Sequence, residues 1–347
     1  MKRHYDIVYL TNTPSFYKLN LCNEIAKRRP ILLVFYGYGS EAVNTVLDGK
    51  SWNFDYEFIN IGDSNKRNKF FSFVKLCILM RKIYAYKIIF AGWLSIEYNL
   101  FSFFSPKHKN VMVCESSILD VSFDGILGRL KKLIINRMSA VLPSGTPHKE
   151  LFNSIKFRGE SFITGSVGIF NKKDKLQKDK AHCPLKYLYV GRLVEVKNVS
   201  LLIDVFNKNG LPLTIVGEGA LSSELKSHAG ENIKFTGFIE NEKLGEIYSA
   251  HDVFILPSTY EPWGLVVEEA LFRGLPVIVS DKVGCGYDLV KRLNTGLIFK
   301  LNDIASINEA IVKISENYSY YSTNVDLIDW EKRNQQQIDA YLEILKS

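Results

Sequence analysis

VFILPSTYEPWGLVVEEALFRGLPVIVSD (residues 253–281) contains a strand, a loop, a helix and a second strand in succession. The apolar run 253–258 predicts one buried strand and the run 276–280 predicts the next. The helix between them is expected to begin near Leu265. Near-continuous apolar strands joined by a helix are typical of a parallel sheet covered on both faces, so this stretch predicts an α/β fold.

The same alternation extends through the rest of the chain. Further strands are expected at 186–191, 213–217 and 233–237 in the second half, and at 6–10, 31–37, 87–92, 110–115, 140–144 and 160–165 in the first. Helical patterns lie between them, for example at 16–28 and 125–138, and a last one follows at 325–346. Many of the strands end in Gly, Ser or Glu. This matters because ligands of open α/β sheets bind at the carboxyl ends of strands.

Length and charge divide the chain into two parts. Its 347 residues, 46% hydrophobic and 23% charged, are typical of a folded protein with two domains. The polar run 171–184 interrupts the pattern and is interpreted as an interdomain linker. Residues 1–180 contain 28 basic and 15 acidic side chains, a net of +13, and the rest contain 16 and 22, a net of −6. The basic half therefore favours an anionic partner or surface.

Several kinds of site and location are not favoured. The five cysteines are scattered without a C-x-x-C pair, so neither a zinc site nor a disulfide framework is expected. The first apolar run is too short for a signal peptide, and the apolar segment 70–80 is too short to span a bilayer. No D-x-D sequence occurs, and we expect no metal and no other cofactor. We expect a reduced, cytoplasmic protein.

Three glycine-bearing strand ends lie in the second half, and the opening stretch contains one of them. Gly191 precedes Arg192 and Lys197, whose planar and compact cations together suit a diphosphate, although a solvated loop is the alternative. Gly217-Glu-Gly219 is similar to a dinucleotide fingerprint, but Ser222 stands in place of the third glycine. A tight turn into a helix is therefore favoured there over a NAD site.

The loop of the opening stretch has the richest chemistry. The N-terminus of the helix after it offers free N–H groups to an anion, and Gly264 lets a ligand approach the backbone. Glu261 and Glu269 can each accept hydrogen bonds from sugar hydroxyls. An anion site flanked by two such acceptors predicts a nucleotide-diphosphate sugar. The alternative for Glu269 is a solvated helix face, which is where we expect the adjacent Glu268.

Taken in order, these segments resemble the retaining nucleotide-sugar glycosyltransferases of family 4, the glycosyltransferase group 1 set. The resemblance covers about residues 186–300 and rests on G191-R-L-x-x-x-K197, V216-G-E-G219, F235-T-G-F-I239 and E261-P-W-G-L-V-V-E-E269. It implies the GT-B fold, in which two doubly wound, Rossmann-like domains face each other across a cleft. It further implies an acceptor-side domain at 1–170, a donor-binding domain at 185–324, and a C-terminal helix at 325–347 that packs back on the first domain.

The resemblance also implies roles for individual residues. Arg192 and Lys197 would neutralise the donor diphosphate as the sugar leaves, and Glu261 would hold hydroxyls of the donor sugar. Glu269 would accept from the ribose. The remaining donor-binding positions are Gly191 and Gly217, the backbone of Trp263, Gly264, Leu265 and Val266, and Phe238 and Ile239, which would lie near the base.

The first half is similar to the same family in outline. The similarity lies in P14-S-F-Y-K-L-N-L-C-N-E-I-A-K27, G92-W-L-S-I-E-Y98 and V113-C-E-S-S117. Where many members have a histidine this chain has Glu115, which is the catalytic candidate of this domain. A buried carboxylate that caps the next loop is the alternative. Tyr17, Lys18 and Trp93 are the candidate acceptor-side residues.

The function that follows is retaining, metal-independent sugar transfer from a nucleotide-diphosphate donor. The acceptor would be a saccharide on a polyprenyl diphosphate lipid, in the synthesis of a surface polysaccharide of the O-antigen, lipopolysaccharide or capsule type. A nucleotide-sugar epimerase of the same fold and a non-catalytic nucleotide-sugar-binding subunit are the alternatives.

The basic half predicts where such a reaction takes place. Residues 66–87 combine seven basic side chains with five aromatic rings, and Lys131, Lys132 and Arg137 extend the basic character. This composition favours docking on an anionic membrane, so the protein would be peripheral at the inner face of the cell membrane. A surface helix whose apolar side packs on the sheet is the alternative. No nucleic-acid-binding motif is found, and we expect no nucleic-acid partner.

Overall fold

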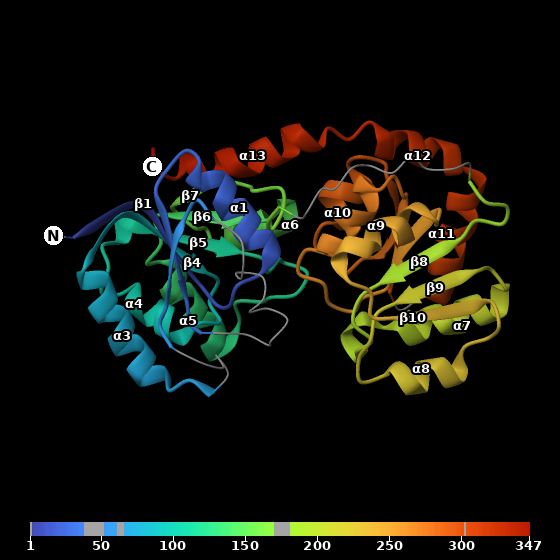
Figure 1. Cartoon of the computed structure of the whole chain (residues 1–347), viewed down its shortest axis with the longest axis horizontal. Helices are drawn as coiled ribbons and strands as arrows, with labels where there is room; N and C mark the ends of the chain where they lie inside the picture. The colour runs from blue at the N-terminus through green and yellow to red at the C-terminus, as the bar shows by residue number, and fades with distance from the viewer. Residues whose placement is uncertain (1, 38–51, 61–65, 170–180, 302) are drawn as a thin grey trace. The chain divides into compact units, whose positions relative to one another are not determined.

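The structure is a computed structural model, and it describes residues 2–37, 52–60, 66–169, 181–301 and 303–347. The chain divides into two compact units. Unit 1 contains Met1–Asn171 and Glu331–Ser347, and unit 2 contains Lys172–Trp330. Each unit is built on a parallel sheet with helices on its faces (Figure 1). The predicted linker lies outside the described residues up to position 180.

The sheet of unit 1 has the strand order β3-β2-β1-β4-β5-β6-β7, with every pair parallel. Its strands are β1 (Arg3–Thr11), β2 (Ile31–Phe35), β3 (Asp55–Phe58), β4 (Ile83–Ala91), β5 (Asn110–Cys114), β6 (Ala140–Pro143) and β7 (Glu160–Ser161). The chain starts at β1, runs outward to β3, and then returns to pair β4 with the other side of β1. The junction between β1 and β4 is therefore the topological switch point, where such sheets bind ligands.

Helices cover both faces of this sheet. α1 (Phe16–Ala26) and α13 (Trp330–Glu343) pack on one face, and α3 (Lys69–Arg81), α4 (Ile96–Phe101), α5 (Gly125–Ile135) and α6 (Thr146–Ser154) pack on the other (Figure 1). Successive side chains of β1 alternate between the two cores, so Tyr9 lies in the α1 core whereas Val8 and Leu10 lie in the α3 core. Near-continuous apolar strands result, as the sequence pattern requires.

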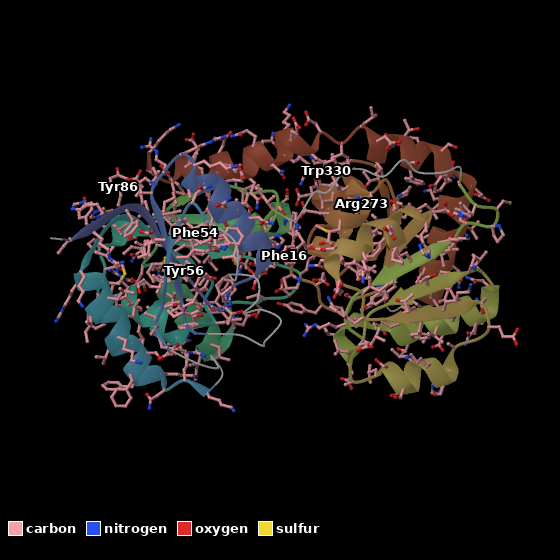
Figure 2. All side chains as sticks on the ribbon, in the orientation of Figure 1. Phe16, Phe54, Tyr56, Tyr86, Arg273 and Trp330 are labelled. Carbon is pink, nitrogen blue, oxygen red and sulfur yellow. The ribbon has the colours of Figure 1, made fainter. Side chains whose placement is uncertain are left out.

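The C-terminal helical pattern is interrupted. The sequence predicts one helix over 325–347, but α12 (Tyr318–Asp326) ends before residue 327 and α13 begins at Trp330. Trp330 lies close to Arg273 in Figure 2, and its ring is 5.8 Å from that of Phe272, in unit 2. Ile338, Tyr341 and Ile344 are buried in the α1 core of unit 1. Apolar spacing continues across the break, which is why the sequence alone does not reveal it.

The sheet of unit 2 has the order β10-β9-β8-β11-β12-β13. Its strands are β8 (Tyr187–Val190), β9 (Leu213–Val216), β10 (Ile233–Gly237), β11 (Val253–Leu256), β12 (Val277–Ser280) and β13 (Gly296–Phe299). Its helices are α7 (Val199–Asn209), α8 (Ser222–His228), α9 (Asn241–Ser249), α10 (Leu265–Phe272), α11 (Ile304–Glu316) and α12. The strand order reverses between β8 and β11, so this sheet also has one switch point.

The predicted α/β class is confirmed, with two doubly wound parallel sheets. Each predicted strand is present, although the one at 160–165 is reduced to β7. The sequence prediction missed β3 and β13. Both are four-residue strands at the edge of a sheet, and neither is buried along its whole length.

The basic segment 66–87 does not form a single surface element. It is divided between α3 and β4, and Lys87 of β4 is only 2% exposed. The Lys87 ammonium donates to the carbonyl oxygens of His108 and Ser347, each at 2.8 Å, and burial lowers its pKa. Arg67 forms an ion pair with buried Glu97. Two of the seven cations, Lys87 and Arg67, therefore make contacts inside unit 1 and do not contribute to a docking surface.

Candidate functional site

The switch point of unit 2 brings together two residues that the sequence predicts from separate motifs. Lys197 follows β8 and Glu261 follows β11, and these strands are adjacent in the sheet. The Lys197 ammonium forms an ion pair with Oε2 of Glu261, and Ser258 Oγ donates to the same oxygen at 3.5 Å. The two side chains are 16% and 13% exposed, so a ligand can still reach this charge pair.

Backbone contacts hold the two loops in register. Glu195–Lys197 forms a single 3-10 turn after β8. In the loop after β11, Thr259 donates to the carbonyl oxygen of Val196 from its N–H at 2.9 Å and from its hydroxyl at 3.2 Å. The loops that contain Lys197 and Glu261 are therefore joined by hydrogen bonds next to the ion pair. The geometry of the ion pair does not depend on two flexible side chains alone.

The glycine-bearing strand ends pack directly on each other. Gly217 has φ +131°, and a Cβ added there would overlap the carbonyl oxygen of Gly191. Gly219 donates its N–H to Ser222 Oγ at 2.9 Å, immediately before α8. The tight turn into a helix that the sequence favours is thus present. Arg192, beside Gly191, is exposed, and its guanidinium has no ion-pair partner among residues 2–37, 52–60, 66–169, 181–301 and 303–347.

The N-terminus of α10 lies in the loop after β11. Gly264 precedes the helix with φ +101°, a conformation that favours glycine. The first amides of a helix, here those of Leu265 and Val266, have no intrahelical partner and carry the positive end of the helix dipole. Trp263, by contrast, is 2% exposed, so its ring supports the loop from inside.

The expectation that Glu268 lies on a solvated helix face is wrong. Glu268 is 3% exposed, and its Oε2 accepts a hydrogen bond from Trp263 Nε1 at 3.0 Å. The side of α10 that faces the core contains Val267 and Leu271, and Glu268 lies beside them. A buried carboxylate needs a donor, and the indole N–H of Trp263 supplies one.

Glu269 lies in a half-buried position on α10. Burial raises its pKa from 4.5 to about 7, and the neighbouring Glu268 carboxylate adds to the rise. The Tyr248 hydroxyl donates to Glu269 Oε2 at 3.3 Å, which opposes the rise because it stabilises the charged form. Tyr248 comes from α9 and belongs to no motif, so the sequence reasoning missed it.

The remaining donor-side positions lie at the same edge of the sheet. Phe238 and Ile239 follow β10, two strands away from β8 across β9. Phe238 is 71% exposed, which is unusual for a phenylalanine at a strand end. The carboxyl ends of β10, β9, β8 and β11 thus present an aromatic ring, a glycine turn, two cations and a carboxylate in that order.

Unit 1 has a pocket of about 130 Å³ at its own switch point. It is lined by Lys18, Trp93 and Glu115, which the sequence predicts from three separate segments, and also by Asn12. Lys18 Nζ lies 3.1 Å from Glu115 Oε1. Burial alone would lower the pKa of Lys18, but the Glu115 carboxylate outweighs it and the pKa is raised.

Tyr17, the fourth predicted residue of this region, does not line the pocket. A Cβ added at Gly168 would overlap the ring and backbone of Tyr17, and Ile169 donates its N–H to the Tyr17 carbonyl oxygen at 3.0 Å. Tyr17 therefore packs against the chain that leaves β7.

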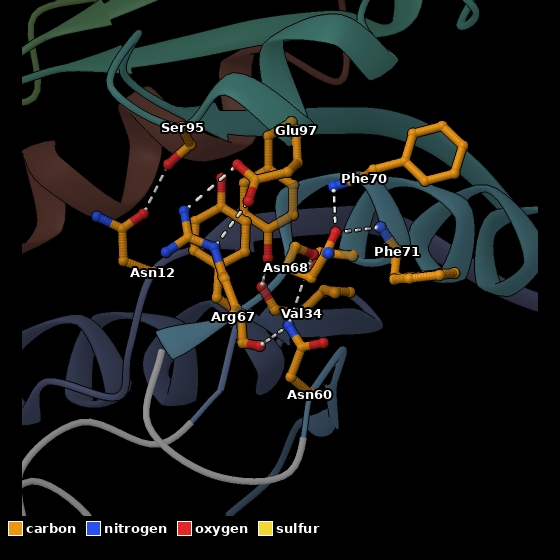
Figure 3. A network of polar contacts seen from close by, with 12 residues as sticks. Asn12, Val34, Asn60, Arg67, Asn68, Phe70, Phe71, Ser95 and Glu97 are labelled. Atoms are coloured by element: carbon orange, nitrogen blue, oxygen red, sulfur yellow. Dashed lines mark hydrogen bonds and ion pairs between the residues drawn. The ribbon is translucent and has the colours of Figure 1, made fainter. Parts of the chain in front are cut away.

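A polar network supports the mouth of this pocket, and sequence reasoning missed it. Figure 3 shows Ser95 Oγ donating to Asn12 Oδ1 at 2.8 Å, which joins the loop after β4 to the end of β1. Glu97, 1% exposed, accepts from Arg67 Nε at 2.7 Å, and the Arg67 guanidinium lies 4.1 Å from the ring centre of Tyr36. Buried Glu97 is paired with Arg67, and the Arg67 guanidinium stacks on Tyr36. These contacts fix the loop that contains Trp93.

Comparison with known proteins places these features in a family context. Residues 170–334 match the sequence model of the family described as "Glycosyl transferases group 1". A GDP-mannose-dependent alpha-mannosyltransferase of Mycobacterium tuberculosis (strain CDC 1551 / Oshkosh) is 36% identical over 115 residues, 33% of this chain and 30% of the relative. Six curated relatives are matched over 24–34% of their own length.

Solved structures match over nearly the whole chain. The lipopolysaccharide outer core galactosyltransferase WaaB, in its apo form, has a TM-score of 0.73 at 14% identity and covers 97% of this chain and 99% of its own. Anabaena Alr3699/HepE in complex with UDP-glucose has a TM-score of 0.69 at 18% identity and covers 98% and 100%. At these identities the similarity concerns the fold. No helix in the described part of the chain is long and apolar enough to cross a membrane.

Proposed function

We propose that the protein transfers a sugar from a nucleotide-diphosphate donor to a saccharide acceptor, because residues 170–334 match the sequence model of the glycosyl transferases group 1 family. The observation that carries the proposal is the Lys197–Glu261 pair at the switch point of unit 2. It places a cation for the diphosphate beside a carboxylate for the sugar hydroxyls. This is the chemistry that a nucleotide-diphosphate sugar requires at one place.

The diphosphate is bound without a metal in this proposal. Arg192, with its exposed guanidinium, and Lys197 neutralise the charge that grows on the leaving phosphate, and the N-terminus of α10 adds backbone donors. The bond between the anomeric carbon and the phosphate oxygen breaks as the acceptor oxygen attacks from the same face. The acceptor proton passes to the departing phosphate, so the configuration at the anomeric carbon is retained.

The nucleoside is held at the same edge of the sheet. Ionised Glu269 accepts hydrogen bonds from the ribose hydroxyls, with Phe238 and Ile239 near the base. The class of donor is supported by the names of similar proteins, which include a GDP-mannose-dependent enzyme and a structure in complex with UDP-glucose.

The acceptor side of the proposal rests on the pocket in unit 1. Lys18 and Glu115 offer a donor and an acceptor for sugar hydroxyls, and Trp93 offers an aromatic face. The acceptor is proposed to be a saccharide on a polyprenyl diphosphate lipid, in the synthesis of a lipopolysaccharide, O-antigen or capsule-type polysaccharide. The name of the similar WaaB structure supports this class of product. The basic N-terminal half would then meet the anionic inner face of the cell membrane.

The test begins with binding. Nucleoside diphosphates such as UDP, GDP and ADP are added in turn, and one of them is expected to raise the melting temperature with a saturable dose dependence. Lys197→Ala is expected to weaken that binding roughly 10–100-fold, because it removes a charged hydrogen bond. Lys208→Ala, which removes an exposed lysine of the same unit, is the matched control and leaves binding unchanged.

Product analysis with the matching nucleotide sugar then identifies the reaction. Transfer yields a free nucleoside diphosphate and a glycosylated acceptor, whereas an epimerase yields an altered sugar and a binding subunit yields no product. Absence of stabilisation by every nucleoside diphosphate, or equal binding by Lys197→Ala and wild type, would contradict the proposed donor site.

A further inference from the structure

The outward surface of α5 is apolar. Its large apolar side chains Ile126, Leu127, Leu130 and Leu133 are exposed to 77%, 73%, 50% and 55%. A surface helix of a water-soluble domain normally turns its polar side outward. A contiguous exposed apolar surface marks a site of contact with a partner or a membrane.

The orientation of α5 is set by its packing on unit 1. Ile126, Leu130 and Leu133 follow the i, i+4, i+7 spacing that places them on one face, while Gly128 and Ile135 are buried on the opposite face. A Cβ added at Gly128 would overlap the backbone of Phe123, so the glycine seats the helix closely on that turn. α5 cannot rotate its leucines inward without losing this contact.

α3 and α4, which lie with α5 on the same face of the sheet, also expose apolar side chains (Figure 1). Phe73 of α3 contacts Phe104 after α4 with ring centres 5.6 Å apart, and Arg137 after α5 donates to the Ser102 carbonyl oxygen at 3.2 Å. We call α3, α4, α5 and the loops next to them the α3–α4–α5 layer. Its other exposed apolar side chains include Phe70, Phe71, Ile78, Leu94, Ile96, Leu100, Phe103 and Phe104.

The charges that border the layer are predominantly positive. Arg129 and Lys132 are exposed on α5, both on one side of the apolar face. Exposed cations in and next to α3 are Lys66, Lys69, Lys75, Arg81 and Lys82. Apolar side chains bordered by cations are complementary to a bilayer with anionic headgroups, because the cations meet the phosphates while the apolar groups enter the boundary of the acyl chains.

The layer reaches the pocket of unit 1. Lys131 of α5 places its ammonium 5.5 Å from the ring centre of Trp93. Trp93 and Leu94 both line the pocket, and Leu94 is 84% exposed. The apolar surface and the candidate acceptor pocket therefore share an edge.

We propose that the α3–α4–α5 layer docks on an anionic phospholipid bilayer, with Ile126, Leu130 and Leu133 of α5 inserted at the headgroup boundary. Bilayer docking itself rests on the surface alone. Its consequence, that a lipid-linked saccharide enters the pocket beside Leu94 from the membrane, rests on the proposed function. The occupant of the surface is the bilayer, and a second copy of the chain is the competing occupant that the experiment tests.

The experiment measures co-sedimentation of the whole chain with vesicles. Wild type is expected to bind vesicles of phosphatidylcholine mixed with phosphatidylglycerol, and to bind phosphatidylcholine alone weakly. The triple variant Ile126→Ser/Leu130→Ser/Leu133→Ser is expected to bind the mixed vesicles about 100-fold more weakly, because three apolar side chains no longer leave water. Arg129→Ser/Lys132→Ser is expected to weaken binding about 10-fold or more, and added salt reduces binding of wild type.

A matched control comes from unit 2. Ile304, Val312 and Leu327 are exposed to 52%, 56% and 75%, close to the values on α5. The variant Ile304→Ser/Val312→Ser/Leu327→Ser makes the same chemical change elsewhere and is expected to bind vesicles as wild type does. Depth is measured separately: a tryptophan introduced as Leu130→Trp should be quenched by brominated phosphatidylglycerol, whereas Leu327→Trp should not.

Three results would overturn docking by insertion. The first is no binding of wild type to mixed vesicles, and the second is unchanged binding of the α5 triple variant. The third is a wild-type dimer in light scattering that the triple variant converts to a monomer without any change in vesicle binding, which would assign the face to a second copy. Sugar transfer to a water-soluble acceptor stays unchanged in the triple variant. Vesicle binding needs no transfer, so failure of the proposed function leaves this test intact.

Discussion

The burial of Glu269 predicts a pH dependence of the free energy of unfolding that can be measured. Its carboxyl is half-buried on α10, and burial raises its pKa from 4.5 to about 7. A carboxyl whose pKa is raised on folding favours the folded state while it is protonated. That contribution is complete below the unfolded pKa and is lost as the pH rises through the folded pKa.

The size of the effect follows from the two pKa values. At about 1.36 kcal/mol per pKa unit, a rise from 4.5 to about 7 lowers the free energy of unfolding by roughly 3.4 kcal/mol when Glu269 is fully ionised. Between pH 5 and pH 8 the loss is about 2.5 kcal/mol, because part of the proton-binding difference lies below pH 5. Glu269→Gln keeps the shape of the protonated carboxyl and cannot ionise, so it escapes this loss.

The assay is urea unfolding at pH 5 and at pH 8. At pH 5 we expect the free energy of unfolding of Glu269→Gln to differ little from that of wild type. At pH 8 we expect the difference to have grown by about 2.5 kcal/mol in favour of the variant. Glu246→Gln removes an exposed carboxylate from α9 of the same unit and is the control for net charge. Comparing each variant with wild type at each pH cancels the titration of all other groups.

Equal pH dependence in wild type and Glu269→Gln would refute the buried position of this carboxyl. A nucleotide-binding measurement adds a second check, since ionised Glu269 is the form that accepts hydrogen bonds from ribose. Binding of the preferred nucleoside diphosphate by wild type should therefore strengthen as the pH rises from 5 to 8, and binding by Glu269→Gln should not.

Four further predictions concern the donor site and its support. Arg192→Ala and Lys197→Ala should each lower turnover about 10²–10³-fold in folded protein, and near-normal turnover would contradict the diphosphate assignment. EDTA should leave turnover unchanged, and loss of turnover that Mg²⁺ restores would contradict metal-free binding. Trp263→Phe should lower the free energy of unfolding by about 1–3 kcal/mol through loss of its hydrogen bond to a buried carboxylate, measured by urea unfolding. Gly217→Ala should lower the free energy of unfolding by at least about 2 kcal/mol, because a Cβ there overlaps backbone atoms. Gly210→Ala is the control: Gly210 has φ +69° but open space around it, so the loss should be about 1 kcal/mol. Equal losses in the two variants would contradict the close packing at Gly217.

Much of the fold could be predicted from local patterns. The apolar runs locate the strands because each strand is buried on both faces, and the stretch 253–281 alone predicts the strand, loop, helix and strand that the structure contains. β3 and β13 were missed because they are short edge strands that are not buried along their whole length. The break between α12 and α13 was missed because the apolar spacing does not stop there.

The candidate site was predictable in composition more than in arrangement. Arg192, Lys197, Glu261 and Glu269 were identified from their motifs, but their partners were not. Tyr248 hydrogen-bonds Glu269 from 21 residues away and has no sequence signal of its own. The burial of Glu268 depends on which side of α10 meets the core, and a short apolar helix does not reveal that side in its sequence.

By itself, the sequence determined the elements, the chemistry available at each strand end, and the match of residues 170–334 to the glycosyl transferases group 1 model. These are local properties, set by spacing along the chain. Only the tertiary structure decided that Lys197 meets Glu261, 64 residues away, because that contact requires β8 and β11 to be neighbours in the sheet. It also decided that α5 turns its leucines outward. The close fit of Gly128 on the Phe123 turn sets the orientation of the helix, whereas the apolar periodicity of its sequence does not set that orientation.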